Sequence, residues 1–303
     1  MTIIMKTLYK LNAVLLFFFA AFAYGQQETN FTIYRNNMNI INPAYAGADG
    51  ETIISSSFKS QWAGVKDAPE TQAVSFGTPT GKRLGIGLSV INDKTFVEKQ
   101  TSVFADFSYL IPMNETLDLY LGVKAGGNFY DVNVNGLQTY NVSPDPSLVN
   151  ISRFNPNFGI GAYLKHEKYY ISLSSPKMLS TQRAKNQDGV ATVASDRPHI
   201  YLSGGYDIKL NENFILKPST LFRYVNGAPT SLDITGVLNY KKQFELGAAY
   251  RTDKAISGLA TIKVNNWLDF GYAYEHSLRD EIASVTNGTH EFYLRFNLTP
   301  KAN

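Results

Sequence analysis

Short segments that alternate apolar and polar residues recur from Arg83 to Leu298, with brief polar turns between them. Clear instances are residues 268–275 (LDFGYAYE) and 292–298 (FYLRFNL). A strand sends successive side chains to opposite faces, so each segment has one apolar and one polar face. In a bilayer, only a closed barrel satisfies the backbone hydrogen bonds of β structure. The pattern therefore predicts an all-β, antiparallel transmembrane β-barrel with a polar lumen.

Alternation and turn residues together predict about fourteen strands. An even number is typical of bacterial barrels. Two segments fit less well: residues 51–62 are rich in serine, and Pro218 predicts a bulge because proline cannot donate in a central ladder. The predicted strands are residues 51–62, 70–78, 83–92, 100–111, 116–130, 155–165, 168–175, 198–210, 214–225, 230–240, 243–252, 256–265, 267–276 and 289–298.

The connections differ in length according to the strand that they follow. Those after even-numbered strands are tight, whereas residues 131–154, 176–197 and 277–288 form long connections after odd-numbered strands. Outer-membrane barrels usually have short periplasmic turns and longer external loops. We therefore expect these three loops to lie outside the cell.

The amino terminus reads as a secretory signal peptide. Lys6 and Lys10 precede an apolar run from Leu11 to Ala23, and small residues follow up to Gly25. Cleavage before Gln26 is the preferred interpretation, with cleavage after Ala23 as the alternative. The expected organisation is a signal peptide (1–25), a periplasmic or lumenal lead-in (26–50), an outer-membrane barrel (51–299) and a short tail (300–303).

The composition excludes several classes of function. Loss of the signal peptide leaves 26 basic and 25 acidic residues, so the charge gives no reason to expect a nucleic-acid partner. The chain contains no cysteine, which rules out disulfides, thiol catalysis and thiolate metal sites. No stretch after the signal peptide approaches the roughly 18 apolar residues of a transmembrane helix.

The alternation assigns side chains to the two faces of the wall. Lipid-facing residues would include Leu84, Ile86, Leu88, Val90, Leu117, Leu119, Leu121, Val123, Phe158, Ile160, Ala162, Leu164, Phe244, Leu246, Ala248 and Tyr250. Candidate lumen charges are Asp106, Asp118, Lys124, Arg223, Glu245, Arg251, Asp269, Glu275, Glu291 and Arg295, with Lys217, Asp233 and Lys263 on the same face. Both signs occur together, which favours mutual pairing in a partly filled lumen over an ion-selective path.

Enzymatic chemistry has little support in the sequence. His166, His199, His276 and His290 form no metal-binding pair at helix or strand spacing, and no Gly-x-Ser-x-Gly elbow is present. The glycines in residues 85–87 and 122–127 lie within predicted strands and open no helix, so they are not phosphate loops. Inward-facing glycines would instead leave room for a side chain from across the lumen. We expect no catalytic residue, no metal and no cofactor.

Residues 26–50 alternate poorly and contain the run Asn42, Pro43, Ala44, Tyr45, Ala46, Gly47. Asn-Pro favours the start of a turn, and the glycines that follow supply flexible positions before the first strand. This run, together with Gln61 and Trp62, is the candidate partner-contact or plug segment. The alternative is a simple lead-in that caps the floor of the barrel, and both interpretations could hold.

The order of several short motifs resembles the PorP/SprF family. The motifs are residues 42–47 (NPAYAG), 58–62 (FKSQW), 68–72 (APETQ), 83–89 (RLGIGLS), 92–94 (NDK), 155–161 (NPNFGIG), 217–219 (KPS), 227–229 (GAP), 249–251 (AYR), 272–275 (YAYE) and 288–291 (GTHE). The resemblance covers the chain from about Phe31 to Leu298. It departs at residues 95–97, where the family usually has a glycine, and in the tail beyond Phe296.

This resemblance implies a non-enzymatic outer-membrane protein of the type IX secretion system of Bacteroidota. Its implied partners are membrane lipid, periplasmic ring and peptidoglycan-binding components, and a large secreted adhesin, in some members one used for gliding motility. The barrel alone also permits a porin-like diffusion channel for small solutes. A distant third hypothesis is an outer-membrane hydrolase.

Overall fold

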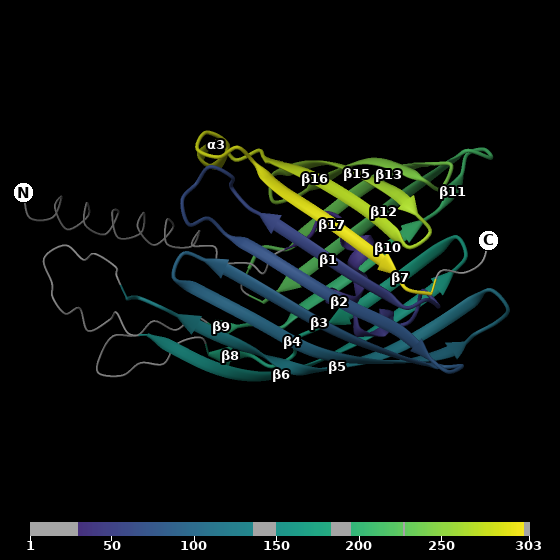
Figure 1. Ribbon diagram of the computed structural model, residues 1–303, viewed down its shortest axis with the longest axis horizontal. Helices are drawn as coiled ribbons and strands as arrows, with labels where there is room; N and C mark the ends of the chain where they lie inside the picture. Colours follow the sequence, from purple (N-terminus) through teal and green to yellow (C-terminus); the bar gives the residue numbers. More distant parts are fainter. Residues whose placement is uncertain (1–29, 136–149, 183–194, 227, 300–303) are drawn as a thin grey trace, which may run out of the picture.

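A closed antiparallel β-barrel forms the body of the protein in this computed structural model, which describes residues 30–135, 150–182, 195–226 and 228–299 (Figure 1). The wall elements are β1 (Ile53–Ser60), β2 (Glu70–Thr80), β3 (Leu84–Thr95), β4 (Glu98–Pro112), β5 (Leu117–Val132), β6 (Ile151–His166), β7 (Tyr169–Ser175), β10 (His199–Tyr206), β11 (Ile208–Lys209), β12 (Phe214–Val225), β13 (Ser231–Tyr240), β14 (Phe244–Arg251), β15 (Ala255–Asn265), β16 (Leu268–Ser277) and β17 (Thr289–Asn297). A separate two-stranded sheet joins β8 (Thr181–Gln182) and β9 (Ser195–Asp196).

The ring closes where β1 pairs with both β2 and β17. On the other side, β10 pairs with both β7 and β12. The short β11 pairs with β12 in the same register as β10, so β10 and β11 are two pieces of one strand. The wall therefore has fourteen strands, which confirms the count predicted from the sequence.

The structure contradicts the bulge that Pro218 predicted. The pairing of β12 with β13 runs through Pro218 opposite Gly236 without a shift of register. On the other edge of β12, the β10 pairing ends at Gly205 opposite Ser219 and resumes at Ile208 opposite Leu216. Pro218 therefore lies in the stretch of β12 where the pairing with β10 and β11 is interrupted. Because proline has no N–H to donate, the pairing has a gap there, and no extra residue is inserted as a bulge would require.

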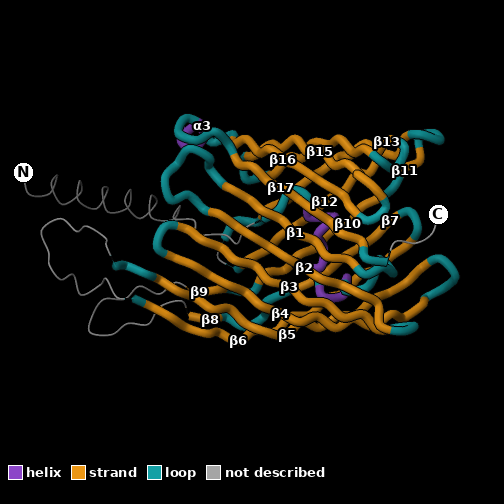
Figure 2. The backbone as a smooth tube through the Cα atoms, in the orientation of Figure 1, coloured by secondary structure: helices purple, strands orange, loops and turns teal. Residues whose placement is uncertain are grey.

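The strands that precede the long connections all finish at one end of the barrel, and every connection at the other end is a short turn (Figure 2). We call the end where β5, β7 and β16 finish the long-loop mouth, and the other end the short-turn mouth. The helix α3 (Asp280–Ala283), not anticipated from the sequence, forms part of the β16–β17 connection. The tight turns predicted after every second wall strand are confirmed, since they follow β2, β4, β6, β11, β13 and β15. Much of the predicted long loops 131–154 and 176–197 lies outside the described residues.

The two faces of the wall follow the predicted alternation. On β3 the side chains of Leu84, Ile86 and Leu88 are exposed, while the residues between them are buried. The same outward placement holds for the other predicted apolar faces, from Leu121 and Val123 on β5 to Leu246 and Tyr250 on β14. Exposed Tyr240 and Trp267 lie near strand ends, where aromatic side chains suit the membrane interface.

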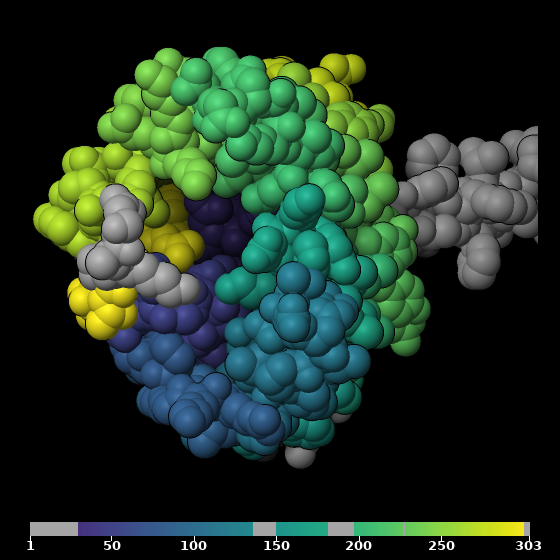
Figure 3. Space-filling model, turned by 90° about the vertical axis from the view of Figure 1, so that its right-hand side faces the viewer, coloured from purple at the N-terminus to yellow at the C-terminus, as the bar shows by residue number. Residues whose placement is uncertain are grey.

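A short helical segment lies inside the barrel. It comprises η1 (Tyr34–Asn37), α2 (Met38–Ile41) and η2 (Pro43–Tyr45), and its side chains form much of the buried core. Figure 3, seen from the short-turn mouth, shows this N-terminal part of the chain within the ring of strands. We call the described residues 30–50 the plug. In the described part of the chain, no helix has the length and apolarity needed to cross a membrane.

Candidate functional site

The plug descends the lumen from one mouth to the other. Near the long-loop mouth, the backbone N–H groups of Thr32 and Ile33 donate to the Glu291 carboxylate at 2.7 and 3.0 Å. Near the short-turn mouth, Lys165 Nζ donates to the carbonyl of Ala48 at 2.5 Å. Contacts at both ends hold the segment lengthwise, so the plug is part of the folded barrel.

Asn42 fixes the turn in the middle of the plug. Its side chain is fully buried, and its Nδ2 donates to the carbonyl of Ala162 at 3.0 Å and to Ser172 Oγ at 2.7 Å. Its Oδ1 accepts from the backbone N–H of Ala44 at 2.9 Å and so caps η2. Pro43 opens that helix with its φ already set and with no N–H to satisfy. The Asn-Pro pair therefore joins the plug to β6 and β7 at a defined position.

Glycines on the inner face of the wall make the close approach of the plug possible. A Cβ at Gly85 would collide with the Ala46 carbonyl, and one at Gly122 with the backbone of Ala44. A Cβ at Gly161 would collide with the side chain of Asn42. The sequence suggested room for a side chain from across the lumen; the room is used by the plug, largely by its backbone.

Removal of the Asn42 side chain should loosen the plug. In Asn42→Ala the Ala162 carbonyl and Ser172 hydroxyl lose a buried partner, which costs about 1–3 kcal/mol in the free energy of unfolding. The measurement is urea unfolding of the barrel in lipid vesicles. The exposed Asn266 provides a matched control, because Asn266→Ala should change stability by less than about 0.5 kcal/mol. Equal stability of the two variants would contradict this role for Asn42.

Most of the predicted lumen charges lie in ion pairs or hydrogen bonds. Lys124 and Asp106 pair at 2.9 Å across neighbouring strands, with side chains 2% and 0% exposed. Arg251 binds Asp233 and Glu275, Lys217 binds Glu245, and Arg295 binds Asp49 of the plug. Asp118 and Asp269 are half-buried. This pairing is what the mixture of signs in the sequence favoured.

Two polar side chains of the plug, Tyr45 and Arg35, interact with carboxylates near the short-turn mouth. The Tyr45 hydroxyl donates to the Asp49 carboxylate, and burial of Tyr45, with Asp49 beside it, raises the pKa of the phenol well above its ordinary value. Burial would lower the pKa of Arg35, but the hydrogen bond to Asp207, 2.5 Å away, raises it. Tyr45 therefore stays a donor and Arg35 a cation at any physiological pH.

Sequence reasoning missed two residues that hold the plug. Lys59 is a buried side chain of β1 whose Nζ donates to the Asn30 carbonyl at 2.5 Å. Asn39 lies in α2 and its Nδ2 contacts Asp106 Oδ2 at 3.4 Å. Lys59 could have been predicted from the sequence. It stands two and four residues after Ser57 and Ser55, so all three side chains face the same, inner side of the strand. Asn39 had no such signal, since its segment does not alternate.

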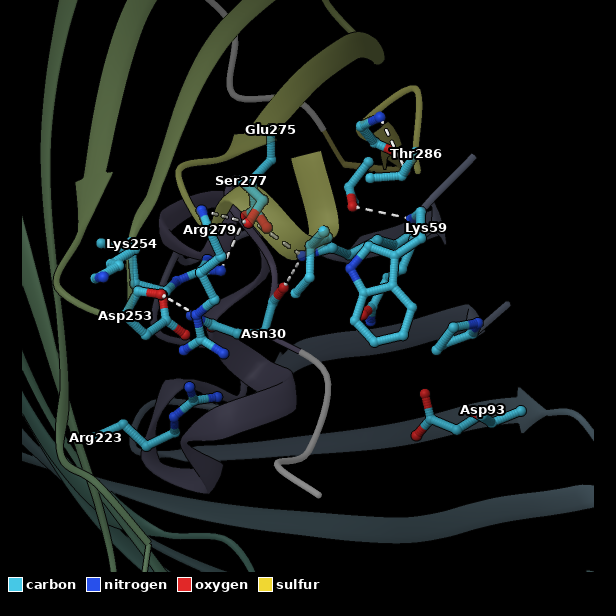
Figure 4. A pocket seen from close by; sticks show the side chains of 18 of the residues that line it. Asn30, Lys59, Asp93, Arg223, Asp253, Lys254, Glu275, Ser277, Arg279 and Thr286 are labelled. Atoms are coloured by element: carbon cyan, nitrogen blue, oxygen red, sulfur yellow. Dashed lines mark hydrogen bonds and ion pairs between the residues drawn. The ribbon is translucent and has the colours of Figure 1, made fainter. Parts of the chain in front are cut away.

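Between the plug and the long-loop mouth, the lumen widens into a cavity of about 870 Å³, which we call the vestibule. Figure 4 shows Lys59, Glu275 and Arg279 around Asn30, with Arg223, Asp253 and Lys254 on one side and Asp93 on the other. Gln61 and Trp62 also line it. The structure therefore separates these two residues from residues 42–47, with which the sequence grouped them. Buried Arg223 lies here as well.

The chemistry of this lining is that of charge and hydrogen bonding. Among the residues that the structure describes, no group of three or more His, Cys, Asp or Glu side chains is arranged to hold a metal ion. Asp253 lies in the turn after β14, and burial raises its pKa against the opposing effect of Arg251 and Arg223. The lining thus carries side chains of both charges.

Comparisons with known proteins return other barrels. The Acinetobacter baumannii outer membrane protein Omp33 is 8% identical, with 82% of this chain and 99% of that chain covered and a TM-score of 0.48. The CymD monoaromatic hydrocarbon channel is 11% identical, with coverage of 86% and 92% and a TM-score of 0.47. The KdgM porin is 10% identical, with coverage of 81% and 99% and a TM-score of 0.39. No curated protein matches the chain.

The family comparison is more specific. Residues 23–296 match the family described as type IX secretion system membrane protein PorP/SprF. The match includes the whole plug and nearly the whole wall, in line with the resemblance carried by the ordered motifs. The barrel and this match together indicate an outer-membrane component of that secretion system. The chain belongs to the PorP/SprF family.

Proposed function

We propose that this protein is a non-enzymatic outer-membrane component that supports the secretion or surface attachment of large adhesins through protein–protein contacts. The observation that carries the proposal is the plug. A segment that is hydrogen-bonded to the wall at both mouths and packed against inward glycines occupies the lumen below the vestibule. A filled lumen suits an anchor better than a conduit.

The two mouths offer different surfaces for partners. The long-loop mouth has the vestibule and the β16–β17 connection with α3, and we assign it to contact with the exported adhesin. The short-turn mouth has tight turns, and we assign it to the periplasmic ring and peptidoglycan-binding components. Export through the signal peptide of residues 1–25 and insertion among outer-membrane lipids belong to the same proposal. So does a role in gliding motility where the adhesin serves that purpose.

Deletion of the chain in its native host should abolish surface display of a large adhesin. The measurement is the surface proteome of intact cells, together with colony spreading if the host glides. Complementation with the wild-type chain is the control. A second strain should carry a chain in which residues 279–285, including α3, are replaced by a short Gly-Ser turn. An unchanged surface proteome in the deletion strain would contradict the proposal.

The second candidate is a porin-like channel, and the vestibule of about 870 Å³ is the observation that favours it. Planar-bilayer recording separates the two functions. We expect the purified protein to show no stable unitary conductance, because the plug and its ion pairs fill the lumen below the vestibule. A reconstituted general porin, recorded under the same conditions, is the positive control. A stable open conductance of the wild-type protein would favour the channel.

A further inference from the structure

The turn between β13 and β14 has an uncommon backbone for its sequence. Lys241 and Lys242 have φ angles of 52° and 55°, and the N–H of Gln243 donates to the carbonyl of Tyr240 at 3.0 Å. This is the type I′ form, in which both central residues are left-handed and Asn-Gly is strongly preferred. Among the described residues, no other two consecutive non-glycine residues have positive φ. Two lysines thus occupy positions that disfavour any residue with a Cβ, and an outlier of this kind points to a function of the side chains.

Neighbouring groups hold this turn in place. The N–H of Lys241 donates to the carbonyl of Asn213 in the β11–β12 turn at 2.7 Å, and the N–H of Lys242 donates to Oδ1 of the buried Asn239 at 2.9 Å. On the other side, the N–H of Lys263 on β15 donates to the carbonyl of Gln243 at 2.8 Å. The turn is bonded to the strands and turns on both sides of it, so the backbone of the two lysines is fixed.

The two ammonium groups of this turn are exposed and carry uncompensated charge. Neither forms an ion pair in the part of the chain that the structure describes. The nearby carboxylates already have partners, because Glu212 pairs with Lys209 at 2.9 Å and Glu245 pairs with Lys217 at 2.7 Å. Two adjacent positive charges therefore remain at the short-turn mouth, and they suit a ligand of negative charge.

Aromatic side chains adjoin the lysines on the lipid-facing side of the wall. Lys241 Nζ lies over the ring of the exposed Tyr240, 5.3 Å from its centre. The strand register places Phe214 and Phe244 on either side of Tyr240, and the ring centres of Phe214 and Tyr240 are 4.9 Å apart. A soluble anion or an acidic protein would use the charges alone. A phospholipid would use both features, with its phosphate at the lysines and its acyl chains on the aromatic row.

We propose that Lys241 and Lys242 form a binding site for a phospholipid of net negative charge, in the leaflet at the short-turn mouth. The two ammonium groups bind the phosphate, and the acyl chains lie along Phe214, Tyr240 and Phe244. Basic residues beside a membrane attract anionic headgroups, and aromatic side chains favour the same depth. The proposal requires only the barrel in its membrane, so it can fail without affecting the role proposed in secretion.

Quenching of tryptophan fluorescence by brominated lipid tests the site. The chain has two tryptophans, so the reporter protein carries Trp62→Phe, Trp267→Phe and Phe244→Trp and has a single indole in the aromatic row. It is reconstituted in phosphatidylcholine vesicles with the same minor fraction of brominated phosphatidylglycerol or of brominated phosphatidylcholine. Each lysine near a charged membrane surface is worth roughly a fivefold change in binding. We therefore expect the reporter to prefer phosphatidylglycerol by about fivefold or more.

Two variants of the reporter separate this site from general attraction by charge. Lys241→Asn/Lys242→Gly removes both charges and supplies the residues that the turn prefers, so its urea midpoint should equal or exceed that of the reporter. Its preference for phosphatidylglycerol should fall to about one. The matched control is Lys82→Gln/Arg83→Gln, which removes two exposed charges from the β2–β3 turn at the same mouth and should keep the preference. Heat-modifiable gel mobility verifies that each protein folds.

Three outcomes would overturn the proposal. The first is equal quenching of the reporter by the two brominated lipids. The second is a preference that persists in folded Lys241→Asn/Lys242→Gly, or that the Lys82→Gln/Arg83→Gln control loses to the same extent. The third is loss of the preference when millimolar inorganic phosphate is added, because the site would then bind a soluble anion and not a lipid.

Discussion

Gly122→Ala should displace the plug and open the barrel. The added Cβ would collide with the backbone of Ala44, which cannot rotate away as a side chain can. Overpacking of this kind costs about 1–3 kcal/mol in the free energy of unfolding, and collision with backbone places this site at the upper end. Urea unfolding in lipid vesicles measures the loss, and planar-bilayer recording should show conductance that the wild-type protein lacks.

Two other strand glycines make the experiment specific. A Cβ at Gly236 or at Gly258 would meet no atom within 4 Å, so Gly236→Ala and Gly258→Ala add the same methyl group without a collision. Both should match the wild type in stability within about 0.5 kcal/mol and remain silent in the bilayer. If Gly122→Ala behaved like these two variants, the fit between plug and wall would not depend on the inward glycine.

Lys124→Met should be the most destabilising change of a single charge. It leaves the carboxylate of Asp106, which is 0% exposed, without its ion-pair partner. Breaking a buried pair from one side costs about 3–5 kcal/mol, because the remaining charge is buried and uncompensated. The double variant Lys124→Met/Asp106→Leu should recover most of that loss, as replacement of a whole buried pair by apolar residues is often neutral.

The control is an ion pair with the same distance and different burial. Lys209 and Glu212 also pair at 2.9 Å, but their side chains are 64% and 89% exposed. Lys209→Met should therefore cost less than about 1 kcal/mol. Urea unfolding in vesicles compares the three variants with the wild type. A similar loss of unfolding free energy for Lys124→Met and Lys209→Met would contradict this prediction. It would mean that water reaches the Asp106–Lys124 pair in the lumen.

The wall of the barrel was predictable because its signal is local. A period of two residues and the chemistry of the turns were enough to place fourteen strands and their lipid-facing sides. The prediction of a bulge at Pro218 was wrong. What decides the backbone there is the break between β10 and β11 on the neighbouring strand, which the local sequence around Pro218 does not show. Register with a distant partner cannot be read from one strand.

The interior was harder to predict for a related reason. The lead-in segment has no period, so burial of Asn42 or Ala44 leaves no trace in its own sequence. The lumen charges were identified, but which of them pair depends on register and on depth in the barrel. Gln61 and Trp62 were grouped with the Asn-Pro run by their place in the chain, whereas the length of β1 carries them to the other mouth.

The pairing of β1 with β17 joins residues 53–60 to residues 290–297 and closes the ring. The plug is hydrogen-bonded to both of these strands. Glu291 and Arg295, which bind the plug from β17, belong to the last strand to leave the ribosome. Pairings of such large sequence separation form slowly. Closure of the ring and these two contacts of the plug therefore both require β17. A chain truncated before β17 would lack both this pairing and two of the charged side chains that bind the plug, so the sheet could not close through β17 around the segment inside it.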